Sequence, residues 1–443
     1  MTDNEQGLSA AQQRISVIMA NFNGERHIRQ ALRSVLDQTH DNLELIVSDD
    51  GSSDASRRIV YEEMALDPRI RLIEAPAPSG PAGARNRALE IATGDWVAIV
   101  DSDDIIHPER LARLLQSAMV LGADLVADDL VFFGDDPLES QGTLLRQLAL
   151  KAPQEFDAVA LISGRLLGAE NLSLGYLKPL IRRGALGQTR YNENLRIDED
   201  CDLYLRLLLG GARFMLIPDA LYLYRRHPLS TSHRLGVASL ERMIAAQAAV
   251  LRDQPPERED LIRAITRRMK LQARELSHVR TMEALKAGDW LAAAGRLLRN
   301  PRNVLSLMRS VKERVQRQLR RRDSSGDVRA TMNLVLCQRG QVVPTEYSGF
   351  EVFEVPAVNE RGWAASAAET WMRLARLACK HDLDIIAIDR AGEFALGLVP
   401  RFGSAKVVYP APTAADVRPP GSAEAEAQAI PVVQPARSCQ EEA

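Results

Sequence analysis

Hydrophobic and polar positions along the first third of the chain predict strands and helices in alternation. Short apolar runs predict buried strands, and longer segments with apolar residues on one helical face predict amphipathic helices. The expected strands are Ile15–Ala20, Leu43–Ser48, Arg69–Glu74, Trp96–Val100 and Asp124–Phe133. The expected helices are Glu25–Gln38, a segment capped by Asp54, Ala82–Ala92 and one from Pro108 to about Leu121. Such alternation predicts an α/β fold with a mostly parallel sheet covered on both faces.

The pattern changes beyond this region. Between residues 161 and 233, one clear helix is expected, around Asp202–Leu209. The stretch from about residue 237 to residue 322 is expected to be helical and becomes increasingly basic. Further strands are expected at 332–337, 384–389 and 405–410, with a helix at 364–380. We therefore expect five parts: a disordered N-terminus (1–13), a main α/β domain (14–235), a basic helical region (236–325), an accessory α/β module (326–412) and a disordered tail (413–443).

Composition excludes several classes of protein. With a net charge of −3, 46% hydrophobic and 26% charged residues, the chain of 443 residues is typical of a soluble globular protein and not of a general nucleic-acid binder. Its four cysteines lack CxxC spacing, which favours a reducing compartment and argues against structural zinc. The N-terminus lacks the apolar core of a signal peptide, and no apolar run approaches the roughly 18 residues of a spanning helix. We therefore expect a cytoplasmic protein, and peripheral contact with the inner face of the cytoplasmic membrane is compatible with this expectation.

Polar clusters follow each of the first four expected strands. They are "ANFNGE" (20–25), "SDDGSSD" (48–54), "PSGPAGARN" (78–86) and "DSDD" (101–104). Each cluster alone is common turn or helix-cap chemistry. Ligands of doubly wound sheets bind outside the carboxyl ends of the strands, so the joint placement predicts a ligand site there.

The "DSDD" cluster has the geometry of a cation site. Residues i and i+2 of an extended segment point the same way, so Asp101 and Asp103, with Ser102 between them, can address one ligand. Two adjacent carboxylates repel unless a cation or proton lies between them, and oxygen ligands favour Mg²⁺ or Mn²⁺ bound together with substrate phosphates. Asp104 is expected to support this site or to cap the next helix.

Several of these motifs, in this order, resemble one family. "ISVIMANFNGERHIRQALRSVLDQTHDNLELIVSDDGSSD" and "GARNRALEIATGDWVAIVDSDD" are similar to glycosyltransferase family 2, and the resemblance covers roughly residues 14–235. It implies a GT-A (Rossmann-like) fold and an inverting, metal-dependent transfer of sugar from a nucleotide-sugar, with a UDP-sugar favoured, to a hydroxyl acceptor. The acceptor is expected to be a saccharide or lipid-linked molecule in envelope or exopolysaccharide synthesis.

The resemblance also implies roles for individual residues. The nucleotide pocket and donor site are expected to include Ala20, Asn21, Asn23, Glu25, Asp49, Asp50, Arg85, Asn86, Asp101 and Ser102. Within this set, Asp50 should bind a uridine-type base with Asp49 beside it. Asp103 is the expected direct metal ligand, with Asp101 and His227 nearby. Asp200 in "RIDEDCDLYLRLL" is the expected general base, with Glu199 as its neighbour.

The sequence departs from the family pattern in three places and leaves alternatives open. Ala20, Phe22 and Cys201 stand where Thr, Tyr and an aromatic residue are common. The Q-x-x-R-W signature of processive synthases is absent, which favours single additions. Asp200 could instead cap the Asp202–Leu209 helix, and His227 could be a solvated loop residue. Whole-protein alternatives are a sugar-phosphate nucleotidylyltransferase and a catalytically inactive binding module of a polysaccharide assembly complex.

A basic amphipathic segment spans residues 305–322. Its apolar residues follow helical spacing and arginines surround them. Such a helix either packs its apolar stripe on its own domain or lies on an anionic membrane surface. The accessory module has no glycine-rich phosphate loop, so no function is assigned to it.

Overall fold

The computed structural model describes residues 9–134, 143–226 without 146 and 149, 235–290, 331–338, 350–355, 382–387 and 405–407. His227, the basic segment 305–322, the expected helix 364–380 and the tail 413–443 lie outside the described residues.

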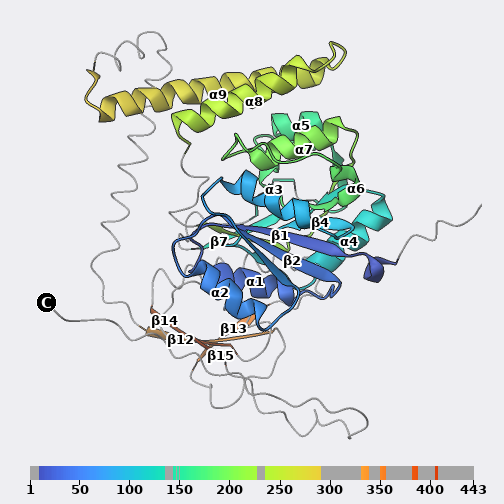
Figure 1. The fold of residues 1–443 in the computed structure, drawn as a ribbon, viewed down its shortest axis with the longest axis vertical. Coiled ribbons are helices and arrows are strands. Elements are labelled where there is room, and N and C mark those ends of the chain that lie inside the picture. Colours follow the sequence, from blue (N-terminus) through green and yellow to red (C-terminus); the bar gives the residue numbers. More distant parts are fainter. Residues whose placement is uncertain are drawn as a thin grey trace, which may run out of the picture. The chain divides into compact units, whose positions relative to one another are not determined.

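An eight-stranded sheet of order β3-β2-β1-β4-β9-β6-β10-β8 is the centre of the main domain (Figure 1). Its strands are β1 (Ile15–Asn21), β2 (Leu43–Asp49), β3 (Ile70–Glu74), β4 (Trp96–Ile99), β6 (Leu125–Ala127), β8 (Gln154–Phe156), β9 (Leu180–Arg182) and β10 (Phe214–Leu216). Neighbouring strands from β3 to β4 are parallel, as are β6 and β10, while β9 and β8 run antiparallel to their neighbours. The chain leaves β1 in one direction for β2 and β3 and returns to its other side for β4. The carboxyl ends of β1 and β4 therefore form a topological switch point, where α/β sheets bind ligands.

Helices cover both faces of this sheet because successive strand residues point to opposite sides. The helices are α1 (Ile28–Leu36), α2 (Ser56–Met64), α3 (Pro81–Ile91), α4 (Arg110–Leu121), α5 (Ala158–Ser163), α6 (Arg183–Leu186) and α7 (Glu199–Leu209), with 3-10 turns η1 (Ala10–Gln12) and η2 (Leu174–Tyr176). Ile18 and Ile46 belong to a core with α3, α5 and α7. Val17 and Leu45 belong to a second core with α1, α2 and α4. The predicted mostly parallel, doubly covered sheet is confirmed.

The segment 124–133, expected to be one strand, forms two strands in different sheets. β6 ends at Ala127 in the large sheet, and β7 (Leu130–Gly134) joins β11 (Tyr222–Arg226) and β5 (Ile105–Ile106) in a three-stranded sheet. Between β6 and β7, the fully buried Asp128 forms an ion pair with the equally buried Arg110 and accepts a hydrogen bond from the backbone of Leu221. The chain turns at this buried pair, so the prediction of a single strand is wrong.

The 3-10 turn η1 lies within the range 1–13 that was expected to be disordered, and residues 1–8 of that range lie outside the described residues. Its end is held to the main domain, since the side-chain oxygen of Gln13 accepts a hydrogen bond from the indole N–H of Trp96 at 3.2 Å.

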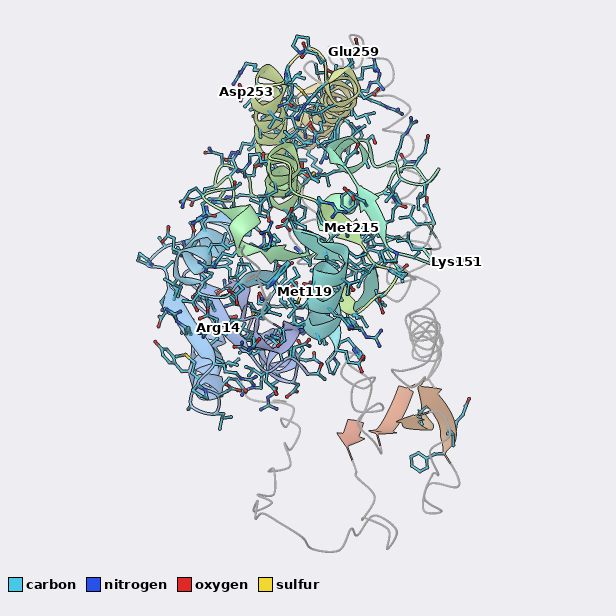
Figure 2. All side chains as sticks on the ribbon, turned by 90° about the vertical axis from the view of Figure 1, so that its right-hand side faces the viewer. Arg14, Met119, Lys151, Met215, Asp253 and Glu259 are labelled. Atoms are coloured by element: carbon cyan, nitrogen blue, oxygen red, sulfur yellow. The ribbon has the colours of Figure 1, made fainter. Side chains whose placement is uncertain are left out.

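A helical hairpin follows the main domain. It consists of α8 (Val237–Arg252) and α9 (Glu259–Lys286), which pack against each other. Their connection lies at one end of the pair, where Figure 2 labels Asp253 and Glu259. Among the described residues, no helix is long and apolar enough to cross a membrane.

The last described segments form a four-stranded parallel sheet of order β13-β12-β14-β15. Its strands are β12 (Thr331–Gln338), β13 (Glu351–Val355), β14 (Asp382–Ala387) and β15 (Ala405–Val407). The three strands expected from sequence are present, within a few residues of their expected bounds, and β13 was not anticipated.

Candidate active site

The loops after β1 and β2 are tied to each other by side-chain hydrogen bonds. Asn21 Nδ2 donates to Asp49 Oδ2 at 2.8 Å, and Asp49 also accepts from the backbone and hydroxyl of Ser52. Asn23 adopts a left-handed conformation (φ 51°), and its Oδ1 accepts from the Ser53 backbone, while Glu25 accepts from the Ala55 backbone. These contacts bring the predicted pocket residues Asn21, Asn23, Glu25 and Asp49 to one edge of the sheet. The buried Oδ1 of Asn21 has no hydrogen-bond partner within the described part of the chain.

Asp50 is the anchor of the loop that enters α3. Its carboxylate accepts hydrogen bonds from the backbone N–H groups of Ser79 and Gly80, from the Ser79 hydroxyl, and from Arg87 Nη2 at 2.7 Å. Burial opposes the charge on this carboxylate, but the hydrogen bonds from Ser79, Arg87 and Gly80 outweigh it and lower the pKa of Asp50. Sequence analysis singled out Asp50 but missed Arg87, which lies on α3 only two residues beyond Arg85.

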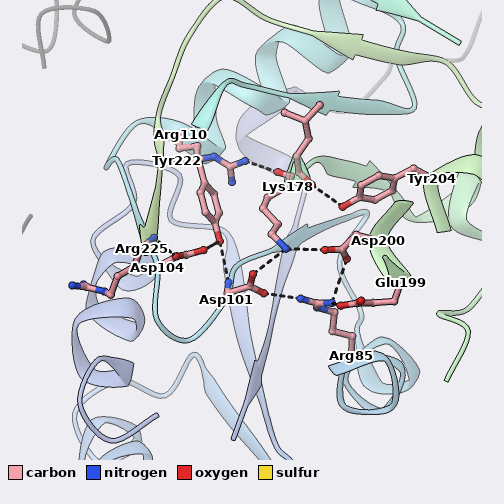
Figure 3. A network of polar contacts seen from close by, with 11 residues as sticks. Arg85, Asp101, Asp104, Arg110, Lys178, Glu199, Asp200, Tyr204, Tyr222 and Arg225 are labelled. Atoms are coloured by element: carbon pink, nitrogen blue, oxygen red, sulfur yellow. Dashed lines mark hydrogen bonds and ion pairs between the residues drawn. The ribbon is translucent and has the colours of Figure 1, made fainter. Parts of the chain in front are cut away.

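A network of charges joins the loop after β4 and the segment before β9 to α3 and α7 (Figure 3). Arg85 forms ion pairs with Asp101 at 2.7 Å, with Glu199 at 2.7 Å and with Asp200 at 3.3 Å. Lys178 Nζ lies between two of the same carboxylates, 2.9 Å from Asp101 and 2.8 Å from Asp200. Three carboxylates predicted to be near the reaction centre are thus brought together around two cations.

The cations and burial change the acid–base behaviour of this network. Burial alone would raise the pKa of Asp101, but the charges of Lys178 and Arg85 outweigh it and lower that pKa. The pKa of Glu199 is raised, because it is buried and lies beside the charge of Asp200. The pKa of Lys178 is raised, since the charges of Asp101 and Asp200 outweigh the burial that would lower it.

Lys178 is a second functional candidate, besides Arg87, that sequence analysis missed. It lies two residues before β9, which runs antiparallel to β4, so the start of β9 lies beside the carboxyl end of β4 and Lys178 lies beside Asp101. The lysine stands in the apolar run "LGYLKPLI", where a lone charge was the available signal. Its ionic partners could not be assigned without the antiparallel strand.

The remaining carboxylate of "DSDD", Asp104, is structural. It is buried and accepts hydrogen bonds from the Tyr222 hydroxyl at 2.6 Å and from the Arg225 backbone at 2.7 Å. Burial, together with the nearby charges of Asp103 and Asp101, raises the pKa of Asp104. Of the two roles expected for Asp104, support of the loop agrees with these contacts. The role as a cap of the next helix does not, because the N-cap residue of α4 is Glu109.

Asp200 lies in the first turn of α7, and its side chain points into the network (Figure 3). The residue at the N-cap position is Asp198, and no side-chain hydrogen bond caps this helix. Because the Asp200 carboxylate is paired with Lys178 and Arg85, the alternative that it caps the helix is wrong. The helix also begins at Glu199, three residues earlier than expected.

Asn86, expected near the donor, holds the loop before α7. Its amide donates to the backbone oxygen of Tyr191 at 3.0 Å and to Glu193 at 2.8 Å, and accepts from the Tyr191 backbone N–H at 2.8 Å. Arg85 and Asn86, neighbours on α3, therefore hold two points of the segment that leads into α7: Asn86 at residues 191–193 and Arg85 at residues 199–200.

The described residues fit a metal only together with a phosphate ligand. No three His, Cys, Asp or Glu side chains within the described ranges are grouped as a ligand set. Asp101 forms ion pairs with Arg85 and Lys178, and Asp104 accepts a hydrogen bond from Tyr222; Asp103, the metal ligand expected from the family resemblance, lies between them in the same loop. Mg²⁺ commonly binds through one or two carboxylates together with waters and substrate phosphates, and a site of that kind is compatible with this arrangement.

Comparisons with known proteins show the family to which the chain belongs. Residues 16–162 match Glycosyl transferase family 2. The chain is 35% identical over 243 residues to the succinoglycan biosynthesis protein ExoO of Rhizobium meliloti, covering 54% of this chain and 68% of that protein. It is 33% identical over 249 residues to ExoU of the same organism, covering 55% and 71%. A solved structure of residues 1–349 of TarS from S. aureus is similar at a TM-score of 0.48 and 23% identity, covering 64% of this chain and 79% of that one.

The protein is a glycosyltransferase with the GT-A type of α/β fold, as the resemblance implied. It belongs to glycosyl transferase family 2.

Proposed function

We propose that this glycosyltransferase is a metal-dependent, inverting and non-processive enzyme that transfers a sugar from a UDP-sugar to a hydroxyl of a saccharide or lipid-linked acceptor in polysaccharide synthesis. The observation that carries the proposal is the shared network of Asp101, Lys178 and Asp200, which links the "DSDD" loop to the start of α7. A carboxylate that faces the donor-side acids from a separate helix has the position that a general base for an incoming acceptor needs. The names of ExoO and ExoU, both succinoglycan biosynthesis proteins, support a role in polysaccharide synthesis.

In the proposed reaction, Asp200 accepts the proton of the acceptor hydroxyl. The acceptor oxygen forms a bond to the anomeric carbon from the face opposite the nucleotide, while the bond from that carbon to the phosphate oxygen breaks and the nucleoside diphosphate leaves. Arg85 and Lys178 keep Asp200 at a fixed position relative to Asp101, and they supply positive charge beside the departing diphosphate. Glu199, held by Arg85, is a neighbour that shapes the site without taking the proton.

Asp103 is the residue proposed to hold Mg²⁺ or Mn²⁺, with Asp101 and His227 nearby. A bound divalent cation would stabilise negative charge on the leaving diphosphate.

The nucleotide is proposed to bind over the interlocked loops after β1 and β2, with Asp50 and Asp49 at the base and Ala20, Asn21, Asn23 and Glu25 lining the pocket. The unpartnered Oδ1 of Asn21 supports this position, because a buried acceptor without a donor is costly unless a ligand satisfies it. Asp50 already accepts hydrogen bonds from Ser79, Gly80 and Arg87. A base N–H would therefore share this carboxylate with the loop that leads into α3. Arg85, Asn86 and Ser102 complete the proposed donor side.

Replacement of Asp200 by Asn tests the base. Asp200→Asn keeps the shape of the side chain but cannot take the acceptor's proton, so kcat should fall by about 10²–10⁴-fold while donor binding persists. Transfer is measured with a panel of UDP-, GDP- and dTDP-sugars, and donor binding is measured by calorimetry. Asp202→Asn is the matched control, because Asp202 lies two residues further along α7 and pairs with Arg206 instead.

Three outcomes would contradict parts of the proposal. An Asp200→Asn enzyme with normal kcat would refute the base, and turnover that survives complete chelation of divalent cations would refute metal dependence. Binding of GDP- or dTDP-sugars alone would refute the UDP preference.

The two alternative activities predict different products. A nucleotidylyltransferase would release pyrophosphate from a nucleoside triphosphate, and membership of family 2 argues against it. A catalytically inactive binding module would bind nucleotide-sugar but never release nucleoside diphosphate. The complete set of Asp101, Lys178, Glu199 and Asp200 in one network argues against such a module.

A further inference from the structure

Asp198, immediately before the Glu199–Asp200 pair, has a strained backbone. Its φ of 73° and ψ of 9° lie in the left-handed region, which residues with a side chain adopt rarely and at an energetic cost. The backbone oxygen of Asp198 accepts the first hydrogen bond of α7, from Asp202 N at 3.0 Å. This single residue therefore sets the direction in which the chain enters α7, and with it the direction of the Asp200 side chain.

Arg268 of α9 holds Asp198 in this conformation. One guanidinium nitrogen of Arg268 donates to both carboxylate oxygens of Asp198, at 2.7 and 2.8 Å, and the other donates to the sulfur of Cys201 at 3.1 Å. Cys201 is the residue that follows Asp200 and is itself buried. Arg268 thus hydrogen-bonds to the chain on both sides of the Glu199–Asp200 pair, although it lies 67 residues from Cys201 and 70 residues from Asp198 in sequence.

Apolar packing fixes α9 at the position from which Arg268 reaches Asp198. Leu261, Ala264 and Ile265, three to seven residues before Arg268, belong to the same buried core as Leu161 of α5 and Leu205 of α7. Because α9 packs directly on α5, and α5 on α7, the guanidinium group is presented by a rigid element rather than by a free helix.

We propose that the helical hairpin is part of the catalytic apparatus, and that Arg268 is a positioning residue that holds Asp198 left-handed so that Asp200 faces Lys178 and Arg85. Arg268 touches neither substrate nor reacting atoms and acts only through the backbone at the start of α7. This inference rests on the proposed role of Asp200 as the base. It assigns a role in transfer to a helix that lies beyond residues 16–162, the part matched by the family.

Arg268→Met tests the proposal in the full-length chain. Misplacement of a reacting group by about 1 Å can cost on the order of 10²-fold in rate, so kcat should fall by roughly ten- to a hundred-fold. The KM for the donor should be unchanged, because Arg268 hydrogen-bonds to Asp198 and Cys201, and neither of these is a proposed donor-site residue. Arg263→Met is the matched control on the same helix, since among the described residues Arg263 pairs with Glu259 and Asp260 at the start of α9, and its side chain is 65% exposed, against 21% for Arg268.

A second substitution separates positioning from general stability. Glycine adopts the left-handed conformation without steric cost, so Asp198→Gly should restore much of the kcat that Arg268→Met loses, although it restores no contact to α9. If Arg268→Met does not fold, Arg268→Lys replaces it, because lysine keeps the charge but loses the double contact; the same rescue by Asp198→Gly is expected. A normal kcat in both Arg268 variants, or a loss that Asp198→Gly does not relieve, would overturn the proposal.

The Asp200→Asn background distinguishes failure of this inference from failure of the proposed function. If Arg268 acts through Asp200, Arg268→Met should lower kcat no further in an enzyme that already carries Asp200→Asn. An additive loss would refute the positioning role while leaving the base intact. A normal rate for Asp200→Asn itself would instead refute the base.

Discussion

At the scale of single residues, the candidate site depends on how a small number of buried charges neutralise one another. Asp101, Glu199 and Asp200 face Arg85 and Lys178 with little exposure to water. Removal of one member of a buried ion pair is costly because the partner charge is left unsolvated. The residues that hold Asp200, the proposed base, are therefore also expected to stabilise the fold.

Lys178→Met is the residue-level test of this expectation. Methionine preserves the length of the side chain, but Asp101 and Asp200 lose their 2.9 and 2.8 Å ion pairs, and three carboxylates then share Arg85 alone. We expect a loss of about 3–5 kcal/mol in the free energy of unfolding at pH 7, measured by urea denaturation, and a lower kcat. Lys151→Met, at an exposed position, should leave both quantities nearly unchanged. Equal stability of the Lys178→Met and wild-type proteins would show that the network is not buried as described.

The sequence located most of these residues but not their partners. Asp101, Arg85 and Asp200 were identified because they lie in short motifs at the ends of predicted elements. Lys178 was missed because its role depends on an antiparallel strand inserted between β4 and β6. The Asp124–Phe133 segment was assigned to one strand because periodicity does not register a buried pair such as Asp128 and Arg110.

At the scale of elements, the parallel strands are joined at their amino ends by one carboxylate. Glu44 of β2 accepts hydrogen bonds from the Ser16 hydroxyl of β1, from the backbone and hydroxyl of Thr93, and from Arg71 of β3. Burial would raise the pKa of Glu44, but the hydrogen bonds from Ser16 and Thr93 outweigh it and lower the pKa from 4.5 to about 2. Glu44 therefore stabilises the edge of the sheet opposite the candidate site.

Glu44→Gln should destabilise the protein in a manner that depends on pH. Because the folded pKa lies below the unfolded value, the ionised Glu44 contributes its full stabilisation above about pH 4.5 and loses it as the pH falls toward 2. We expect Glu44→Gln to lower the free energy of unfolding by roughly 2 kcal/mol at pH 7, with the difference from wild type shrinking in acid. Urea denaturation between pH 3 and 7 measures this difference, and Glu90→Gln on an exposed position of α3 is the control. A difference that grows as the pH falls would contradict the assignment.

At the scale of the whole molecule, the helical hairpin and the main domain share a core. Ile265 of α9 is fully buried in the cluster that includes residues of α3, α5 and α7. The two parts are therefore expected to unfold together, although the sequence divided them at residue 235.

Ile265→Ala tests this shared core. Loss of a buried isoleucine side chain typically costs about 2–5 kcal/mol, and we expect that loss in the single unfolding transition of the main domain. Leu271→Ala on the same helix is the control, because Leu271 is 53% exposed and should change stability by less than about 0.5 kcal/mol. An early, separate transition that alone responds to Ile265→Ala would show that the hairpin folds independently.

Association with anionic membranes stays a prediction from sequence, because the basic segment 305–322 lies outside the described residues.

The sequence by itself determined the alternation of strands and helices, the edge of the sheet at which polar clusters gather, and the family, because these depend on periodicity and on motifs only a few residues long. Tertiary structure alone decided which charges meet. Lys178 reaches Asp101 and Asp200 through an antiparallel strand, and Arg268 reaches Asp198 across about 70 residues through the packing of α9 on α5. Ion pairs of this kind depend on where separate elements pack, and spacing along the chain carries no record of that packing.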